Sequence, residues 1–424
     1  MPAPSRDQVD ATGTGDVAAD GHGHGSSDGP AFELTVDRVA TGGAAIGNGP
    51  DGRVVFVPGA VPGERVLVRA EVEHRNRIEA ALLHVVEASP DRVEPACPHV
   101  ADACGGCDWQ HVAPARQSTL RRDIVADCLR RLGGLDPEAS GIDIVDGPEL
   151  PADGYRTTVR AAVVDGRAAY RRRASHDPVT VEQCEIAHPL VAELLVDGRF
   201  GSATEVVVRA GANTGERLVV VDPTADGVVV PDGVKVVGID ELDAGARPHY
   251  HEELAGLRLQ ISARSFFQCR PDGARALAEL AGDAVADAEG TLLDGYCGVG
   301  LFGALAGIGR LVVGVESDPS AVADATWNLR PHGRVINERF ERWAAEPVGA
   351  AIVDPARAGL RAGGCDTLAA TGAQLVALVS CDPASLARDA KLLDKRGYTL
   401  DRVTVLDLFG HTSHIEAVSR FVRR

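Results

Sequence analysis

A short apolar run at residues 375–379, LVALV, most constrains the fold because it has no polar face. Such a run suits a strand that is covered on both sides, as in a parallel sheet flanked by helices. It ends in the polar turn 380–383, SCDP, so Cys381 is expected just beyond the carboxyl end of a strand. Open α/β sheets place their ligands at that edge. A thiol there can act as a nucleophile, although most free cysteines are small packing residues.

The chain after residue 257 alternates strand and helix patterns in the same way. Strand patterns occur in TLLDGY, LVVGVE, AAIVDP and LVALVS, and helices are expected at about 273–287, 320–329 and 385–396. This alternation predicts a parallel, doubly wound α/β sheet. Two last apolar segments, at 398–408 and 415–422, predict a hairpin that closes the sheet.

Composition divides the 424 residues into four expected parts. Residues 1–30 are rich in Gly, Asp and Ser, which predicts a disordered tail. Residues 31–90 contain five short strand patterns between Gly/Pro turns and predict a small OB-like barrel. Residues 91–250 are expected to form a central α/β domain that includes a helix at about 110–132, and residues 251–424 the sheet domain.

The charge and the cysteine content limit which partners and which compartment we expect for the chain. A formal net charge of −18 argues against a surface that is basic overall, but it leaves room for a local basic face. No segment has the pattern of a signal peptide or a membrane span, so we expect no membrane association. We also infer no obligate protein partner. Nine unevenly spaced cysteines favour a reducing cytoplasm over a disulfide framework.

A glycine-rich turn follows one of the predicted strands. Residues 294–303 read DGYCGVGLFG, in which Gly298, Gly300 and Gly303 form a G-x-G-x-x-G pattern. Such glycines let the backbone turn tightly and approach a ligand. Glu316 ends the next predicted strand, where a carboxylate can accept hydrogen bonds from ribose hydroxyls. The pattern suits a dinucleotide or S-adenosylmethionine, and Asp294 either binds the ligand or ties down the turn.

Two further acidic residues have positions that suit catalysis. Asp354 follows an apolar strand and precedes a proline, so it either holds a flat heterocycle or forms a turn with Arg357. Glu416 lies in HTSHIE near the chain end and is either a general base or a surface charge.

A group of cysteines has the spacing of a metal centre. Four thiolates can hold a [4Fe–4S] cluster or a tetrahedral zinc ion, and spacing alone leaves both open. The remaining cysteines, Cys128, Cys269, Cys297 and Cys365, are interpreted as packing residues. The four candidate ligands are Cys97, Cys104 and Cys107, in C-x6-C-x2-C, and Cys184.

Several motifs occur together in an order that is specific. DGYCGVGLFG, VVGVESDPSAV, DPARAG, LVSCDPASLARD and HTSHIEAV follow one another in the second half of the chain. Together they resemble the uracil-5 RNA methyltransferases that use S-adenosylmethionine. The barrel resembles the TRAM domain of that family, and RRRASHDPVTVEQCEIAHP is similar to its iron–sulfur branch. The resemblance covers about residues 32–424.

The resemblance implies a role for each matching residue. It makes Cys381 the nucleophile that adds to carbon 6 of uracil, and Glu416 the base that removes the carbon-5 proton. It favours iron–sulfur over zinc at the cysteine group, and RNA as partner, with ribosomal RNA favoured over transfer RNA. It also implies cofactor contacts at Gln268, Tyr296 and Glu316, and at Asp354 where cofactor and uracil meet.

Two positions depart from the family pattern. Leu301 stands where an Asn is common, which removes an expected cofactor contact. Gly410 stands where a Pro is usual, which predicts a looser loop before Glu416.

Other functions also fit parts of the pattern. The alternatives are a methyltransferase for a different base, an iron–sulfur RNA-binding protein without catalysis, and a NAD-linked oxidoreductase that gives Cys381 no role. A basic run, Arg171, Arg172 and Arg173, with Arg156 and Arg160 nearby, either grips RNA phosphates or forms a solvated face.

Overall fold

The computed structural model describes residues 29–424, so the predicted disordered tail lies almost wholly outside the described residues. These residues form two compact units. The first contains residues 29–100, Cys107–Ile124 and His411–His414. The second contains Ala101–Gly106, Val125–Gly410 and Ile415–Arg424. The four-part division expected from composition stays a prediction.

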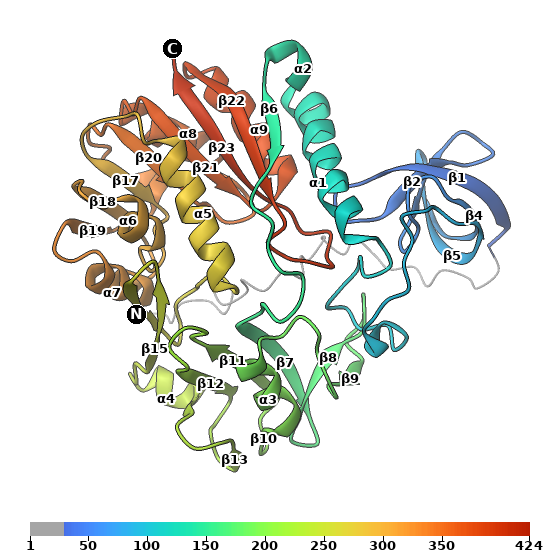
Figure 1. Ribbon diagram of the computed structural model, residues 1–424, viewed down its shortest axis with the longest axis horizontal. Helices are drawn as coiled ribbons and strands as arrows, with labels where there is room; N and C mark the ends of the chain where they lie inside the picture. Colours follow the sequence, from blue (N-terminus) through green and yellow to red (C-terminus); the bar gives the residue numbers. More distant parts are fainter. Residues whose placement is uncertain (1–28) are drawn as a thin grey trace. The chain divides into compact units, whose positions relative to one another are not determined.

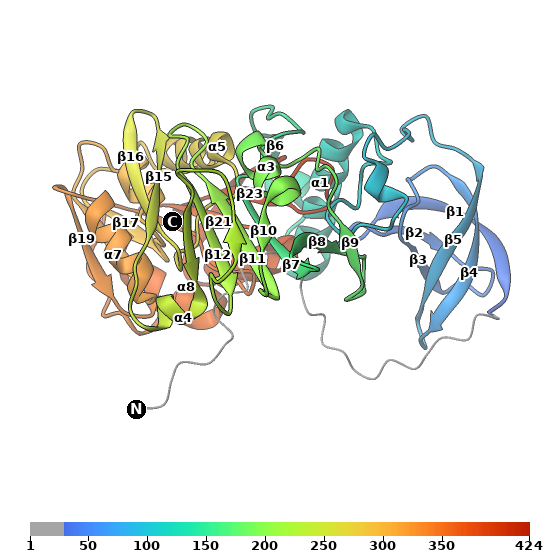
Figure 2. The same cartoon turned by 90° about the horizontal axis from the view of Figure 1, so that it is seen from below.

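The first unit contains a closed barrel of five strands in the order β1-β2-β3-β5-β4 (Figure 2). Side chains alternate between the two faces of a strand, so Val66, Val68 and Ala70 of β4 are buried inside the barrel. This confirms the predicted small barrel of short strands. The strands are β1 (Ala31–Val39), β2 (Ala45–Asn48), β3 (Val54–Val57), β4 (Arg65–Glu73) and β5 (Arg77–Glu87), and a short helix, η2 (Pro98–Val100), follows.

The second unit contains a six-stranded sheet in the order β14-β12-β11-β7-β8-β9. Helix α3 (Pro189–Asp197) covers one face, where its Val191 and Leu194 pack against Val206 and Val219. The strands are β7 (Thr158–Val164), β8 (Arg167–Arg171), β9 (Pro178–Thr180), β11 (Glu205–Ala210), β12 (Arg217–Asp222) and β14 (Lys235–Gly238). Smaller elements are β10 (Arg199–Phe200), β13 (Val228–Val229), α4 (Ile239–Asp243) and the hairpin β15 (His249–Leu254) and β16 (Leu257–Ser262).

An eight-stranded sheet in the order β19-β18-β17-β20-β21-β23-β22-β6 forms the rest of the second unit (Figure 1). The first five strands in this order are parallel, and β23 and β22 form the predicted closing hairpin. An unpredicted strand, β6, comes from residues 143–146 and pairs with β22. The strands are β6 (Asp143–Asp146), β17 (Leu292–Gly295), β18 (Val312–Glu316), β19 (Gly333–Asn337), β20 (Ala350–Val353), β21 (Leu375–Ser380), β22 (Tyr398–Leu406) and β23 (Glu416–Arg423).

Helices lie on both faces of this sheet, as a doubly wound fold requires. Ile352 and Ala377 share a buried cluster with Leu277 of α5, whereas the alternate residues Val353 and Leu378 are buried on the opposite face. The helices of the chain outside the six-stranded sheet are α1 (Pro114–Cys128), continued by the π-helical turn η3 (Leu129–Gly133), α2 (Pro137–Ser140), α5 (Pro271–Ala284), α6 (Leu301–Ala306), α7 (Pro319–Asn328), η4 (Phe340–Arg342), α8 (Arg361–Ala370) and α9 (Pro383–Asp394).

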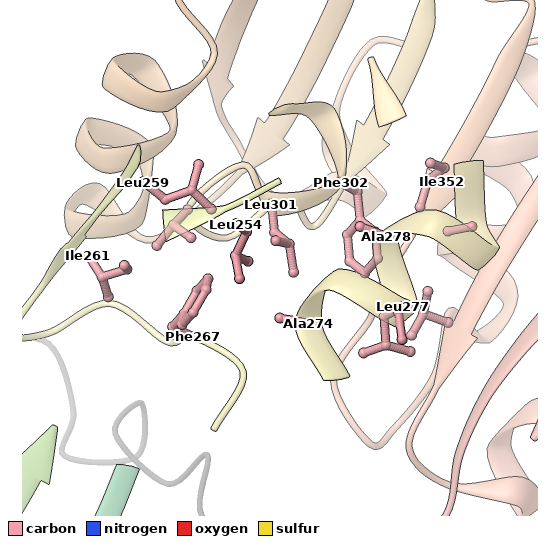
Figure 3. Close-up of a cluster of buried hydrophobic side chains, with 14 of the residues drawn as sticks. Leu254, Leu259, Ile261, Phe267, Ala274, Leu277, Ala278, Leu301, Phe302 and Ile352 are labelled. Atoms are coloured by element: carbon pink, nitrogen blue, oxygen red, sulfur yellow. The ribbon is translucent and has the colours of Figure 1, made fainter. Parts of the chain in front are cut away.

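Helix α5 has its apolar residues on one side. Ala274, Leu277, Ala278 and Ala281 recur at helical spacing and are buried. Figure 3 shows Leu277 and Ala278 beside Phe302, close to Ile352 of the sheet. Within residues 29–424, no helix combines the length and the apolar character that crossing a bilayer requires.

The packing of α5 predicts unequal effects of two leucine truncations on the same helix. Leu277 is fully buried and Leu280 only partly. Leu277→Ala is expected to lower the free energy of unfolding by about 2–5 kcal/mol because it leaves a cavity, and Leu280→Ala should cost less. Melting temperatures from calorimetry check this, and equal losses would contradict the packing.

Candidate active site

The predicted nucleophile and the predicted base are neighbours at one edge of the eight-stranded sheet. Strands β21 and β23 pair in antiparallel register, with Ser380 opposite Ala417. Cys381 and Glu416 each lie one residue beyond this pair, so the register brings them to the same place. Glu416 is 3% exposed, which excludes its interpretation as a surface charge.

Asp354 reaches the same edge from the adjacent strand β20. Its backbone N–H donates to the carbonyl oxygen of Gly295, at the end of β17 (3.2 Å). The edge therefore contains the carboxyl ends of neighbouring parallel strands, where α/β folds bind their ligands.

Helix α9 fixes the turn that contains Cys381. Asp382 caps the helix, since its Oδ1 accepts a hydrogen bond from the backbone N–H of Ser385 (2.6 Å). The Ser385 hydroxyl donates to the carbonyl oxygen of Arg357 (2.7 Å). Further along α9, the carboxylate of Asp389 accepts from the N–H groups of Leu360 (2.7 Å) and Arg361 (3.0 Å). The helix thus holds the DPARAG loop beside Cys381, a role of Asp389 that the sequence pattern did not reveal.

Burial disfavours the charged forms of the three acidic groups at this edge, and neighbouring negative charges add to this effect at Cys381 and Glu416. Burial raises the pKa of Cys381 to about 12, and the charges of Glu416 and Asp354 add to this shift. Burial raises the pKa of Asp354 to about 7. Burial and the charge of Asp354 raise the pKa of Glu416 well above its usual range. Arg357 opposes these shifts at Cys381 and Glu416, so its guanidinium is their positive neighbour and it forms no ion pair with Asp354 among the described residues.

Cys269, interpreted from the sequence as a packing residue, also lies near this group. Burial raises the pKa of its thiol, Arg156 and Arg270 lower it, and the charge of Glu416 raises it further. The residue follows Gln268 in the segment between β16 and α5. No sequence signal distinguished Cys269 from the other cysteines without partners.

The glycine-rich turn is tied down by two carboxylates. Asp294 Oδ2 accepts from the N–H of Gly303 (2.7 Å), while its Oδ1 is buried and has no hydrogen-bond partner among the described residues. One oxygen of Asp294 therefore ties the turn and the other remains available. Glu316 Oε2 accepts from the N–H of Gly298 (3.0 Å).

Glu316 also holds the start of the segment after β18. Its Oε1 accepts from the N–H groups of Ser317 (2.6 Å) and Asp318 (2.7 Å). Together with the bond from Gly298 and a long one from the Ser317 hydroxyl (3.4 Å), these occupy the roughly four acceptor positions of a carboxylate. A further donor would replace the Ser317 hydroxyl and leave the backbone N–H groups held.

A cavity of about 270 Å³ lies between the ends of these strands. Tyr296 lines it, with its hydroxyl donating to Glu341 Oε1 (2.8 Å) and its ring 4.7 Å from that of Phe340. Tyr296 has a φ of +58°, unusual for a residue with a Cβ, so the turn directs this ring into the cavity wall at some cost in backbone energy. The lining residues include Tyr296, Glu316, Glu338, Phe340, Pro355 and Ala356.

Two of the predicted cofactor residues do not line this cavity. Gln268 is buried, at 7% exposure, and it and Asp354 are absent from the cavity wall. Tyr296 and Glu316 are therefore brought together, whereas Gln268 lies in a separate segment.

The two departures from the family pattern have clear packing reasons. Leu301 is buried in the cluster that contains Leu277 and Ile352 (Figure 3), so its side chain serves the core. A Cβ on Gly410 would lie 2.9 Å from the Cα atom of Ala152. Gly410 therefore allows the loop to pack closely on residue 152, and the expectation of a looser loop stays a prediction.

The predicted metal centre is not supported by the geometry. Across residues 29–424, no three His, Cys, Asp or Glu side chains form a group that could hold a metal ion. Cys97 and Cys107 belong to the first unit, and Cys104 and Cys184 to the second. Within the second unit, Cys184 and Cys104 both act electrostatically on Tyr170, whose pKa is raised mainly by burial.

The basic residues near residue 171 divide into two kinds. Arg171, Arg172 and Arg173 are exposed at the end of β8 and in the segment that follows it. Arg160 instead pairs with Glu205 (3.2 Å), and Arg156 donates to the carbonyl oxygen of Thr158 (3.1 Å). Only the exposed run has the position expected of a phosphate-binding face.

Comparison with known proteins identifies the family of the chain. No protein-family model matches it. The chain is 37% identical to a protein of Streptomyces avermitilis named as an uncharacterized RNA methyltransferase, over 92% of this chain and 98% of that protein. It is 32% identical to a protein of the same description from Thermosynechococcus vestitus, over 92% and 98% of the two chains. The chain therefore belongs to the RNA methyltransferase family.

A solved structure shares the fold over most of the chain. The crystal structure of Pyrococcus abyssi tRNA (uracil-54, C5)-methyltransferase with S-adenosyl-L-homocysteine matches with a TM-score of 0.70 and 22% sequence identity. The match covers 92% of this chain and all of that chain. At this identity the similarity concerns the fold.

The electrostatics predict how Cys381 reacts with iodoacetamide. Because its pKa of about 12 lies above the working range, the thiolate fraction and the alkylation rate should rise roughly tenfold per unit from pH 7 to 9. Arg357→Gln removes the positive neighbour that lowers the pKa of Cys381, so it should slow alkylation at pH 8. Arg275→Gln, at an exposed position on α5, is the control. Mass spectrometry of the Cys381 peptide measures the rates, and an Arg357→Gln rate equal to wild type would contradict the arrangement.

Proposed function

We propose that this RNA methyltransferase transfers a methyl group from S-adenosylmethionine to carbon 5 of a uridine in RNA. The observation that carries the proposal is the meeting of the Cys381 thiol with the Asp354 and Glu416 carboxyl groups at the carboxyl ends of β20 and β21 and the start of β23. Methylation at carbon 5 needs a nucleophile that adds to the ring and later leaves it. It also needs a base that removes the carbon-5 proton after the methyl group has been transferred. The shared fold with an enzyme whose name states uracil C5 methylation supports the same assignment.

The nucleophile is needed because carbon 5 of uracil is weakly nucleophilic. The thiol proton of Cys381 passes to the neighbouring Asp354 carboxylate, and addition of the sulfur to carbon 6 forms a C–S bond and moves the ring electrons to oxygen 4, which produces an enolate. Carbon 5 of the enolate then bonds to the methyl group as the carbonyl at carbon 4 re-forms, and the bond between that methyl group and the donor sulfur would break to leave a neutral thioether. Cysteine suits this role because a thiolate is strongly nucleophilic and also departs readily.

Glu416 then completes the substitution. Its carboxylate removes the proton from carbon 5, the electrons of that C–H bond restore the ring double bond, and the C–S bond breaks to release Cys381. A raised pKa suits a base that must take up a proton near neutral pH. Burial of Glu416 also keeps bulk water from this proton transfer.

Asp354 is suited to orient the uracil ring. With a pKa of about 7, its carboxyl group is populated in both protonation states near neutral pH. It can therefore accept a hydrogen bond from ring nitrogen 3 or donate one to oxygen 4. Its place between the glycine-rich turn and Cys381 puts it where methyl donor and uracil would meet.

The residues around the cavity fit S-adenosylmethionine, which supplies an electrophilic sulfonium methyl group when bound. Tyr296, Phe340 and Pro355 offer apolar walls for a flat ring. A ribose hydroxyl could replace the Ser317 hydroxyl, which donates to Glu316 over a long distance of 3.4 Å. The free oxygen of Asp294 is a buried acceptor at the glycine-rich turn, available to a positively charged group of the donor.

The substrate is proposed to be a looped or single-stranded region of RNA. An enzyme that modifies a base must remove it from its stack, which such regions make easier. The exposed arginines Arg171 and Arg172 are suited to contact phosphates, and the barrel is suited to contact RNA as a TRAM-like domain. Ribosomal RNA is our proposed class, and mapping of 5-methyluridine in cells that lack the gene distinguishes it from transfer RNA.

Replacement of the nucleophile tests the proposal directly. Cys381→Ala is expected to abolish formation of 5-methyluridine and covalent trapping by RNA that contains 5-fluorouridine, because no sulfur can add to carbon 6. Cys365→Ala, at a buried cysteine on α8, should retain both activities. Nucleoside analysis after incubation with labelled S-adenosylmethionine and bulk RNA from cells lacking the gene measures turnover.

The outcomes separate the alternatives. A different methylated nucleoside would indicate another target base. RNA binding without any methyl transfer by wild type would indicate a non-catalytic RNA-binding protein, and a persistent adduct in Cys381→Ala would remove that residue from its role.

For the cysteine group we propose a [4Fe–4S] cluster, supported by the similarity of RRRASHDPVTVEQCEIAHP to the iron–sulfur branch of the family and by the proximity of Cys104 and Cys184 to Tyr170. Protein purified without oxygen should then be brown and contain iron and sulfide, and Cys107→Ser should lose the colour because one thiolate ligand is missing. Cys128→Ser is the control, since Cys128 is outside the proposed ligand set. Elemental analysis that finds zinc and no iron would contradict the cluster in favour of a zinc site.

A further inference from the structure

The loop that leads into Glu416 is anchored by a buried arginine that the proposed chemistry does not use. Strands β22 and β23 are joined by residues 407–415, and Leu406 pairs with Glu416 across the base of this loop. The Arg270 side chain is fully buried. Its Nη1 donates to the carbonyl oxygen of Leu408 (3.1 Å), two residues beyond the strand pair.

Arg270 has further hydrogen-bond partners at its Nε and Nη2 atoms. Its Nε and Nη2 donate to the two oxygens of Asp272 (2.8 and 2.6 Å), and Nη2 also donates to the carbonyl oxygen of Pro151 (3.0 Å). A buried guanidinium is costly unless its donors are used and its charge is balanced. Because Asp272 meets this requirement, the orientation of the guanidinium toward Leu408 is well defined.

Tyr155 extends the same anchor to the next turn of the loop. The Arg270 guanidinium carbon lies 4.4 Å from the centre of the Tyr155 ring, a cation–π arrangement. The Tyr155 hydroxyl donates to the carbonyl oxygen of Gly410 (3.3 Å). Gly410 in turn packs against Ala152, where a Cβ would collide. The loop is therefore held at two carbonyl groups, those of residues 408 and 410.

Arg270 is also close in sequence to residues near the proposed reaction site. Arg270 follows Cys269, whose thiol interacts with the charge of Glu416, and Gln268 precedes both. The backbone N–H of Thr157 donates to the carbonyl oxygen of Cys269 (2.7 Å), which joins the segment that contains Tyr155 to the same strip of chain. Residues 268–270 thus connect the proposed donor-binding segment to the loop before the proposed base.

We propose that Arg270, with Tyr155, is a positioning residue that sets the carboxylate of Glu416 for removal of the carbon-5 proton. The inference rests on the proposed uridine methylation. It assigns no contact with RNA or methyl donor to Arg270. Its effect is confined to the second half of the reaction, because sulfur addition and methyl transfer need Cys381, which α9 and the DPARAG loop hold independently.

The experiment compares two labels in single-turnover reactions of the full-length protein. The probe is bulk RNA labelled with [5-³H]uridine in cells that lack the gene. Transfer of a ¹⁴C-methyl group from S-adenosylmethionine reports the first half of the reaction, and release of tritium to water reports loss of the carbon-5 hydrogen. Wild type should give one tritium for each methyl group.

Arg270→Gln should transfer the methyl group at a rate near that of wild type but release tritium about 10- to 100-fold more slowly, since a displaced base loses its reactive geometry. Methylated RNA should then remain covalently attached to the protein after denaturation, as it should more strongly in Glu416→Gln. Tyr155→Phe, which removes a single hydroxyl and should fold normally, is expected to shift the ratio of tritium to methyl in the same direction by less.

Arg420→Gln is the matched control. Arg420 lies on β23, the strand that begins at Glu416, and like Arg270 it donates to a carbonyl oxygen, that of Ala284 (3.0 Å), and to a carboxylate, that of Asp401 (2.6 Å). This variant should lose thermal stability without changing the ratio of tritium to methyl.

Equal slowing of both labels in Arg270→Gln and an unchanged ratio in Tyr155→Phe would overturn the positioning role. Failure of the proposed function looks different: wild type itself would then release no tritium from labelled uridine, whatever the variants do.

Discussion

Parallel pairing of β17, β18, β20 and β21 is the constraint on which the site depends. Parallel strands end at the same edge, so residues that follow separate strands meet although they are distant in the chain. Asp294, Glu316, Asp354 and Cys381 all lie at the ends of these strands. The reversal of β23 then brings Glu416 to that edge from the opposite direction.

Burial gives these groups their chemical character. Desolvation is the largest cause of the raised pKa of Cys381, Asp354 and Glu416, and their mutual repulsion is secondary where it contributes. Because their pKa values are raised, Cys381 and Glu416 hold protons more tightly than usual, and the proposed reaction must move these protons. Arg357 is the positive neighbour that opposes both shifts. Hydrogen bonds hold the segments next to this cluster, at the start of α9 and at Leu408 in the loop before Glu416.

The departures from the family pattern show that a motif position and a packing position can be the same residue. Leu301 follows the glycine-rich turn but contributes to the core between α5 and the sheet. Gly410 packs closely against Ala152. Both residues lie in a fold that is shared, at 22% identity, with the Pyrococcus abyssi enzyme.

Local sequence determined the elements and much of the site. The apolar run without a polar face accounts for the burial of every residue of β21, and it predicted that Cys381 follows the end of a strand. The apolar strand β20 predicted the same position for Asp354. Only the tertiary structure decided that Glu416 lies beside Cys381, that Cys269 joins them, and that Arg270 reaches a carbonyl group 138 residues away. Periodicity and turn residues report the preferences of neighbouring residues, whereas these contacts depend on which strands pair, in which register, and on how loops pack against them.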